Sequence, residues 1–334
     1  MPLISASDYV APRLFQSGHV QTVVPKLFRR VDAPPYRRER FDTPDGDFLD
    51  LDWMRRGTGR LAILSHGLGG GTHRSYMRGM ARTLFRQAWD VLAWNYRGCS
   101  GEPNRLLRSY HSGATDDLDL VVQHALAQGY RQVALVGFSL GGNLVLKYAG
   151  ERGTAVDPRI GAVVAFSVPC DLAAGCQRLE ERANWLYHQN FMVALRAVLR
   201  AKQQRFADAF DFEALDHITT LRAFDDWYTA PVHGFRDAAD YYARCSSKPF
   251  LPDIRIPTLV VNAADDPFLP PACFPVAETQ HHPYVHLEVP SRGGHIGFVA
   301  FNEQDEFWSE RRAARFLNEV LGTIPQHPLL SHAA

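Results

Sequence analysis

Two patterns meet in residues 133–148, Val-Ala-Leu-Val-Gly-Phe-Ser-Leu-Gly-Gly-Asn-Leu-Val-Leu-Lys-Tyr. A short apolar run ends at Gly-x-Ser-x-Gly, and apolar residues at helical spacing follow it. This order predicts a strand, a tight turn that exposes the hydroxyl of Ser139, and a helix. Gly137 and Gly141 suit such a turn, because strand and helix leave no room there for side chains. Ser139 would stand at the helix N-terminus, where free N–H groups favour negative charge, so we predict that it is a nucleophile for acyl transfer.

The same alternation of strand and helix extends along most of the chain. A hairpin is expected in residues 37–54, around Pro44-Asp-Gly46. The remaining patterns predict strands at 61–65, 89–96, 132–137, 161–166, 256–262 and 286–289, and helices at 75–88, 115–128, 140–150 and 303–321. We expect the helix at 115 to be opened by the capping pattern Thr115-Asp-Asp-Leu. Strands that alternate with helices in this way indicate an α/β fold with a mostly parallel, doubly wound sheet.

The alternation divides the chain into three parts. Residues 1–35 are predicted to form an irregular arm packed on the core. Within it, the block Gly18-His-Val-Gln-Thr22 is interpreted as a local turn and not as a functional site. Residues 36–169 and 251–325 form the α/β core. Residues 170–250 are rich in arginine, aromatic residues and apolar stripes, and they interrupt the pattern between two core strands. A helical cap inserted over the site is expected there, with peripheral helices packed on the core as the alternative.

Composition excludes several classes of function. The 334 residues carry 36 Lys and Arg against 36 Asp and Glu, so the net charge of zero points neither to nucleic acid nor to an anionic membrane. Five cysteines without a Cys-x-x-Cys pair fit the reducing cytosol, and we expect a cytoplasmic protein. The N-terminus resembles no secretory leader, and no apolar run approaches 18 residues, so stable membrane insertion is not expected. Nothing in the composition predicts an oligomeric state.

A serine nucleophile needs a base, and the base needs an acid that orients it. In sheets of this kind the chain order is Ser, then Asp or Glu, then His. Asp266 follows the predicted strand 256–262, and His295, flanked by glycines, follows the strand 286–289. Asp266 is preferred to its neighbour Asp265, because Asp266-Pro-Phe-Leu-Pro has the usual Asp-x-x-x-Pro spacing. We expect Asp265 to hydrogen-bond the turn instead.

Two backbone amides are candidates for stabilising an oxyanion. One is the N–H of Leu140, directly after the nucleophile, and the other is the N–H of Leu68 in the glycine-rich loop after strand 61–65. That loop matches neither a P-loop nor a dinucleotide fingerprint, so a phosphate cradle is disfavoured. The cluster His281, His282 and His286 lacks a Cys or carboxylate at ligand spacing, so no metal site is predicted.

The motifs together resemble the YheT-like branch of the α/β-hydrolases, the fourth family of that superfamily. The resemblance covers residues 17–300 and rests on seven blocks: Gly18-His-Val-Gln-Thr22, His66-Gly-Leu-Gly-Gly70 with Ser75-Tyr76, Asn95-Tyr-Arg-Gly-Cys-Ser-Gly101, Tyr110-His-Ser-Gly-Ala-Thr-Asp-Asp-Leu118, the elbow at Ser139, Asp265-Asp-Pro-Phe268 and Gly293-Gly-His-Ile-Gly-Phe298. Ala114 departs from the pattern, which has an acidic residue there. That family includes bacterial esterases, yeast alcohol acyltransferases and phospholipid-cleaving animal members.

Carried over by position, the resemblance implies a triad of Ser139, Asp266 and His295, with no metal and no organic cofactor. The function expected is hydrolysis of small-molecule carboxylic esters of short to medium acyl chains through an acyl-enzyme. Two alternatives remain open: transfer of the acyl group to an alcohol, and a non-catalytic binding protein with the same fold. A degraded triad would mark the binding protein, whereas every element of the triad is present in this chain.

Overall fold

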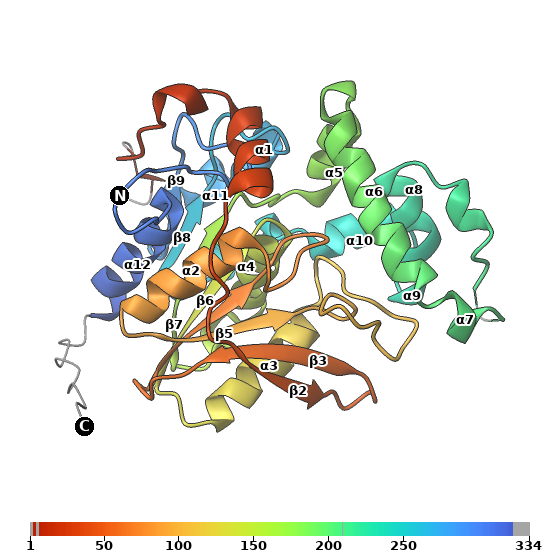
Figure 1. The fold of residues 1–334 in the computed structure, drawn as a ribbon, viewed down its shortest axis with the longest axis horizontal. Helices are drawn as coiled ribbons and strands as arrows, with labels where there is room; N and C mark the ends of the chain where they lie inside the picture. Colours follow the sequence, from red (N-terminus) through yellow and green to blue (C-terminus); the bar gives the residue numbers. More distant parts are fainter. Residues whose placement is uncertain (1–2, 5–6, 209, 323–334) are drawn as a thin grey trace.

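The computed structural model describes residues 3–4, 7–208 and 210–322. Residues 1–2 and 5–6 of the predicted arm, residue 209 of the predicted insertion and residues 323–325 of the predicted core lie outside this description. Within the described residues the centre of the fold is one nine-stranded sheet in the order β1-β9-β8-β7-β6-β4-β5-β3-β2 (Figure 1). Its strands are β1 (Leu3–Ile4), β2 (Arg37–Asp42), β3 (Phe48–Met54), β4 (Arg60–Ser65), β5 (Asp90–Asn95), β6 (Gln132–Phe138), β7 (Ile160–Phe166), β8 (Thr258–Val261) and β9 (Val285–Glu288).

The sheet is mostly parallel, as predicted. Strands β4 to β9 pair in parallel with one another, and β1 pairs in parallel with β9. Strand β3 pairs antiparallel with both β2 and β5 and forms the expected hairpin with β2. Residues of the central strands are buried on both faces, and they alternate between two apolar clusters: Leu61 and Ile63 belong to one, Ala62 and Leu64 to the other. This two-sided burial explains why the strands read as continuous apolar runs.

Helices cover both faces of the sheet. Helix α2 (Ser75–Arg86) packs against α12 (Trp308–Leu321) on one face, and α3 (Thr115–Ala127) packs against α4 (Leu140–Arg152) on the other. Helix α1 (Gly18–Phe28) lies above the carboxyl ends of the strands, and the short α11 (Val276–Thr279) precedes β9 (Figure 1). The α/β-hydrolase architecture expected from the sequence is therefore confirmed.

A run of helices interrupts the alternation between β7 and β8. These helices lie together at one side of the sheet (Figure 1, green to cyan), and we call them the β7–β8 helical segment. They enclose an apolar cluster of their own, built from Met192, Leu199, Leu215, Phe224 and Tyr228 among others. The segment contains α5 (Leu172–Glu180), α6 (Trp185–Arg200), α7 (Gln203–Phe206), α8 (Leu221–Phe224), a π-helical turn (Asp225–Thr229), α9 (Ala230–Val232) and α10 (Ala238–Cys245).

Two predictions about where helices begin were wrong. The N-cap of α3 is Ala114, not Thr115, and it has no capping side chain; the acids of the first turn instead form ion pairs, Asp116 with Arg108 and Asp117 with Arg97. Helix α12 begins at Trp308 rather than at 303. There Phe307 is the N-cap, and its N–H donates to the Glu310 carboxylate, which is one of the two hydrogen bonds of a capping box.

The predicted irregular arm contains a regular helix, α1, with Gly18 in its first turn. A Cβ atom on Gly18 would lie 1.9 Å from the carbonyl oxygen of Asp265. Glycine at this position is therefore required by a contact with a distant part of the chain. Such a glycine, together with Pro25 inside the helix, weakens the local helical signal that sequence patterns detect.

Candidate active site

Ser139 lies in the turn between β6 and α4, with φ 52° and ψ −118°. A positive φ is strained for a residue with a side chain, and here the strain accompanies the sharp reversal that lifts the hydroxyl from the backbone. Two close approaches make the turn possible. A Cβ atom on Gly137 would lie 2.2 Å from the Gly141 carbonyl oxygen, and one on Gly141 would lie 2.3 Å from the Ser65 carbonyl oxygen. The strand–turn–helix expected at this serine is present.

His295 joins Ser139 to Asp266. Its Nε2 lies 2.9 Å from Ser139 Oγ, and its Nδ1 lies 2.9 Å from Asp266 Oδ2 and 3.2 Å from Oδ1. Because a carboxylate only accepts, Nδ1 carries the proton, and Nε2 is left to accept from the serine hydroxyl. The Asp266 side chain is 0% exposed and that of His295 7%, so water competes little for either bond.

Asp265 points elsewhere. Its Oδ1 accepts a hydrogen bond of 2.9 Å from the backbone N–H of Gly294, one residue before the histidine. Burial raises the pKa of the Asp265 carboxyl above its ordinary value. The structure therefore brings Asp266 to His295 and leaves Asp265 as a support of the histidine loop, the arrangement expected from the sequence.

Helix α1 also supports the histidine loop, and this role was missed. Thr22 Oγ1 accepts from the backbone N–H of His295 at 2.9 Å, and Gln21 Oε1 accepts from the N–H of Val299 at 3.1 Å. A Cβ atom on Gly294 would lie 2.4 Å from the carbonyl oxygen of Gly18. The block Gly18-His-Val-Gln-Thr22 was interpreted as a local turn. Its only sequence signal was its inclusion in the family pattern, because the contacts are made across more than 270 residues.

The glycine-rich loop after β4 lines the same cavity as Ser139 through Leu68. The N–H of Gly67 donates to the Tyr76 hydroxyl at 3.0 Å, and the N–H of Gly69 donates to the Tyr110 hydroxyl at 2.9 Å. Between them, the N–H of Leu68 makes no hydrogen bond to any described residue. A Cβ atom on Gly67 would lie 3.3 Å from the Cβ of Ser139, so this loop approaches the serine closely. The two tyrosine hydroxyls thus accept from the amides on either side, and the N–H of Leu68 is left available to an oxyanion.

The second expected oxyanion donor, the N–H of Leu140, lies at the start of a helix. Leu140 is the first residue of α4, so its N–H has no partner within the helix. His66, one residue before the glycine-rich loop, is fully buried; its Nδ1 lies 2.8 Å from the carbonyl oxygen of Gly67, and its Nε2 accepts from the N–H of Tyr96 at 3.3 Å. Burial lowers the pKa of His66 to about 3. This histidine is a neutral support of the loop.

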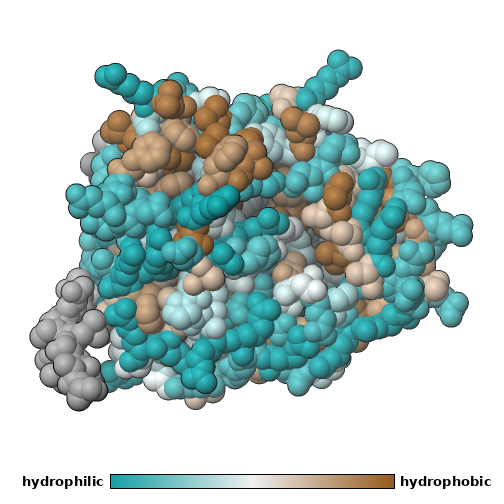
Figure 2. All heavy atoms as spheres, viewed as in Figure 1, coloured by the Kyte–Doolittle hydropathy of each residue, from teal (hydrophilic) through white to brown (hydrophobic). Residues whose placement is uncertain are grey.

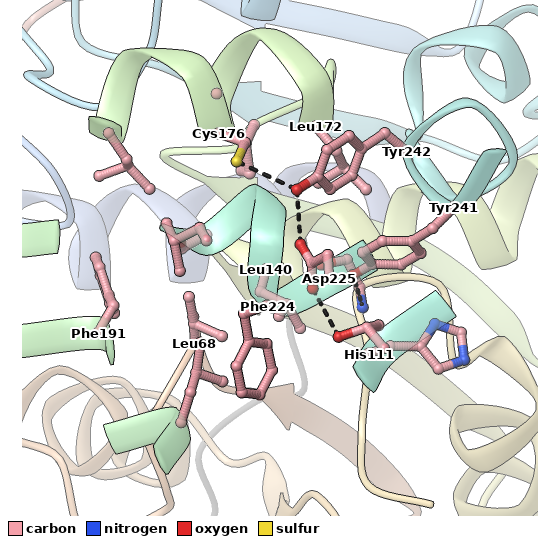
Figure 3. A pocket seen from close by; sticks show the side chains of 18 of the residues that line it. Leu68, His111, Leu140, Leu172, Cys176, Phe191, Phe224, Asp225, Tyr241 and Tyr242 are labelled. Carbon is pink, nitrogen blue, oxygen red and sulfur yellow. Dashed lines mark hydrogen bonds between the residues drawn. The ribbon is translucent and has the colours of Figure 1, made fainter. Parts of the chain in front are cut away.

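A cavity of about 120 Å³ opens from Ser139 and His295 into the β7–β8 helical segment. Most of its wall is apolar and comes from α5, α6 and α8. One side is polar, as Figure 3 shows, with Asp225, Tyr241, Tyr242 and His111 opposite Leu68 and Phe191. The apolar part of the lining includes Leu68, Leu140, Leu172, Leu179, Phe191, Leu195, Val198, Leu199, Leu221 and Phe224.

A second opening of about 760 Å³ leads from the same serine and histidine to the surface. It lies between α1, the glycine-rich loop and α6, where Figure 2 shows the surface hollowed, with apolar side chains on both sides. Its lining is strongly basic and contains one acidic residue, Asp32. Arg29 pairs with Glu310, whereas the other four cations form no ion pair with a described residue. The basic side chains of the lining are Lys26, Arg29, Arg30, Arg74 and Arg78.

One histidine of the cluster near β9, His282, contacts the backbone of the chain. His282 Nδ1 lies within hydrogen-bonding distance of the N–H groups of Tyr284 (3.1 Å) and Val285 (3.0 Å), where the chain enters β9. Across the described residues, no group of three His, Cys, Asp or Glu side chains is placed to hold a metal ion. No helix of the described chain is long and apolar enough to cross a bilayer.

Comparison with known proteins gives a consistent result. Residues 63–300 match the family described as alpha/beta hydrolase fold. The Escherichia coli (strain K12) protein named "Putative esterase YheT" is 34% identical, over 95% of both chains. "Phospholipase ABHD3" of Mus musculus is 31% identical, over 89% of this chain and 74% of that protein.

Solved structures agree at the level of the fold. The Pyrococcus furiosus esterase Pf2001 superposes with a TM-score of 0.56 at 17% identity, over 88% of this chain and 99% of that one. The family match covers more than half of the chain, and the relative from Escherichia coli spans nearly all of it. The chain belongs to the α/β-hydrolase family, in its YheT-like branch.

Proposed function

We propose that this protein is a serine carboxylic-ester hydrolase. The observation that carries the proposal is the hydrogen-bonded chain from Ser139 through His295 to the buried Asp266, with 2.9 Å at each link. Such a chain lets the imidazole accept the serine proton while the carboxylate stabilises the imidazolium that forms. Relatives named as an esterase, a phospholipase and a monoacylglycerol lipase support an ester as the substrate.

The reaction follows from these contacts. Ser139 Oγ attacks the ester carbonyl carbon while His295 Nε2 takes the hydroxyl proton, and the carbonyl oxygen becomes an oxyanion that the N–H groups of Leu68 and Leu140 stabilise. His295 returns the proton to the departing alcohol, leaving an acyl-enzyme. Water, deprotonated by the same nitrogen, then releases the acid and restores Ser139.

The two openings suggest where the two halves of the ester lie. We place the acyl chain in the apolar cavity, whose size favours short to medium chains, and treat the β7–β8 helical segment, residues 170–250, as a cap over it. The alcohol half would lie in the wider opening, where Lys26, Arg30, Arg74 and Arg78 favour an anionic group. Unpaired cysteines throughout the described chain fit a cytoplasmic location.

Hydrolysis of p-nitrophenyl butyrate tests the reaction. The wild-type protein should release nitrophenol, and Ser139→Ala and His295→Ala should each lose that activity, while His217→Ala, at an exposed histidine outside both openings, should keep it. Equal activity in Ser139→Ala would overturn the proposal. Added ethanol distinguishes the acyl acceptor, because a hydrolase yields mainly butyrate, whereas an acyltransferase yields mainly ethyl butyrate.

The placement of the alcohol is tested with two butyrate esters, one of ethanol and one of glycerol phosphate. The double variant Lys26→Gln/Arg74→Gln should raise KM for the glycerol phosphate ester and leave that for ethyl butyrate unchanged. Added salt should reproduce the effect in the wild-type protein, because it screens exposed charges. An equal change for both esters would contradict the placement.

A further inference from the structure

A carboxylate lies in the wall of the mostly apolar cavity. Asp225 lines the same cavity as Ser139 and His295, and Figure 3 shows it on the polar side of the wall. Its Oδ1 accepts from the Thr229 hydroxyl at 2.6 Å, and its Oδ2 accepts from the Tyr242 hydroxyl at 2.7 Å. Each carboxylate oxygen can accept more than one hydrogen bond, so the group retains accepting capacity on the cavity side.

Asp225 has no ion-pair partner in the part of the chain that the structure describes, where no Lys, Arg or His nitrogen forms an ion pair with its carboxylate. Burial raises the pKa of Asp225 to about 6, and the nearby Asp226 and Glu180 act in the same direction. The group is therefore mostly ionised at neutral pH, in surroundings where an unpaired charge is costly.

A hydrogen-bond donor lies beside this acceptor. The Tyr241 hydroxyl accepts from the backbone N–H of Ser112 at 2.9 Å, and within the described chain no acceptor receives its own proton. The ring centroids of Tyr241 and Tyr242 lie 5.2 Å apart, and Tyr242 contacts Asp225 directly. Both tyrosines line the cavity. The wall thus offers one acceptor and one donor on neighbouring side chains.

The backbone also departs from regular geometry at this position. Residues Asp225–Thr229 form a π-helical turn, which places the Thr229 hydroxyl against the Asp225 carboxylate. Single π-helical turns are rare and occur frequently at functional sites. A binding role for the polar wall accounts for the turn and for the uncompensated carboxylate together.

We propose that the polar wall formed by Asp225 and Tyr241 binds a hydroxyl group on the acyl chain, so that the preferred substrates are esters of hydroxylated acids. The substrate hydroxyl donates to the Asp225 carboxylate and accepts from the Tyr241 hydroxyl. An ammonium group fits less well, because it has no acceptor to offer Tyr241. An unsubstituted chain leaves the remaining accepting capacity of Asp225, beyond its bonds from Thr229 and Tyr242, unused on the cavity side. This inference rests on the proposed ester hydrolysis and names its substrate class.

The test compares methyl hexanoate, methyl 3-hydroxyhexanoate, methyl 6-hydroxyhexanoate and methyl 6-aminohexanoate by acid release at constant pH. In the wild-type protein at least one hydroxylated ester should exceed methyl hexanoate in kcat/KM by roughly tenfold, the usual effect of one hydrogen bond to a charged group. Asp225→Leu should abolish this preference or reverse it, and Tyr241→Phe should reduce it. The control is Asp216→Asn, at an exposed aspartate outside the cavity, which should keep it.

Three results would overturn the inference: no preference for either hydroxylated ester, a preference for the amino ester, or a hydroxyl preference of wild-type size in Tyr241→Phe. Tyr241→Phe removes a single oxygen atom and keeps the packing, so the test stands even if Asp225→Leu does not fold. Failure of the proposed function looks different. In that case none of the four esters is hydrolysed, whereas failure of this inference leaves methyl hexanoate a substrate in every variant.

Discussion

The hydroxyl of Thr22 accepts a 2.9 Å hydrogen bond from the backbone N–H of His295. The same hydroxyl donates to the carbonyl oxygen of Gly18 at 2.7 Å, so it connects the first turn of α1 to the histidine loop. That loop is strained, with φ 59° at Ile296 and φ 45° at Phe298. A strained loop persists only when its surroundings hold it, and Thr22 is one of the groups that do so.

Thr22→Val should therefore lower kcat by roughly tenfold and leave KM nearly unchanged. The valine leaves the N–H of His295 without a partner, at a cost of about 1–3 kcal/mol that the loop can avoid by moving the imidazole away from Ser139. Steady-state kinetics on p-nitrophenyl butyrate measures both constants. Thr22→Ser, which keeps the hydroxyl, should restore kcat. A kcat of wild-type size in Thr22→Val would show that α1 does not position the base.

Tyr110→Phe should lower kcat by about tenfold to a hundredfold. The hydroxyl of Tyr110 accepts from the N–H of Gly69, next to the proposed oxyanion donor Leu68. Without it the glycine-rich loop can turn its amides, and loss of one oxyanion donor costs about 10²–10³ in kcat. Tyr284→Phe, at an exposed tyrosine, is the matched control. If both variants keep wild-type kcat, Tyr110 has no role in holding the loop.

Substitutions of the two neighbouring aspartates, Asp266 and Asp265, should have very different effects on kcat. Asp266→Asn should lower kcat by about 10⁴, the effect known when the acid of a serine triad is replaced and the histidine adopts the wrong tautomer. Asp265→Asn should have a small effect, because an amide oxygen can still accept from the N–H of Gly294. Measuring kcat of both variants in one assay shows which aspartate is the acid of the triad. A larger loss of kcat in Asp265→Asn than in Asp266→Asn would assign that role to Asp265.

Asp225→Asn should raise Tm at pH 8. The pKa of this carboxyl rises from 3.8 to about 6 on folding, so the folded protein binds the proton more tightly than the unfolded chain. Stability is then lost as the pH rises through this interval, and the loss is complete above pH 6. The uncharged asparagine avoids it, so the gain in Tm should shrink as the pH falls from 8 towards 4.

Thermal melts at several pH values check this prediction, with Asp216→Asn as the exposed control. An equal Tm for wild type and Asp225→Asn at pH 8 would show that the carboxylate costs the fold nothing. A higher Tm of Asp225→Asn at pH 8 would instead fit a residue that is kept for binding at the expense of stability.

Much of the site was predictable because its signals are local. The turn at Ser139 needs glycines at fixed positions around it, and the acid and base follow successive strands at the same edge of the sheet. Asp266 and His295 could therefore be chosen by their place after β8 and β9. The outline of the sheet followed from the same alternation, since strands buried on both faces read as apolar runs.

The missed features depend on contacts between distant segments. Gly18 fits only because the carbonyl group of Asp265 lies against it, and no local pattern contains that distance. Thr115 resembled an N-cap because the residues after it are acidic. One of these acids, Asp117, instead forms an ion pair of 2.7 Å with Arg97, which no local pattern indicates. Asp225 gave no signal in the sequence, because its proposed role depends on the cavity that it lines together with Ser139.

Labelling with a fluorophosphonate, followed by mass mapping of the modified peptide, shows whether Ser139 is an activated nucleophile. A fluorophosphonate reacts with a serine only when a base has activated it. We expect one modification, at Ser139, that is lost in His295→Ala and retained in His217→Ala. Folded protein that remains unlabelled, or labelling of Ser139 that persists without His295, would contradict this expectation.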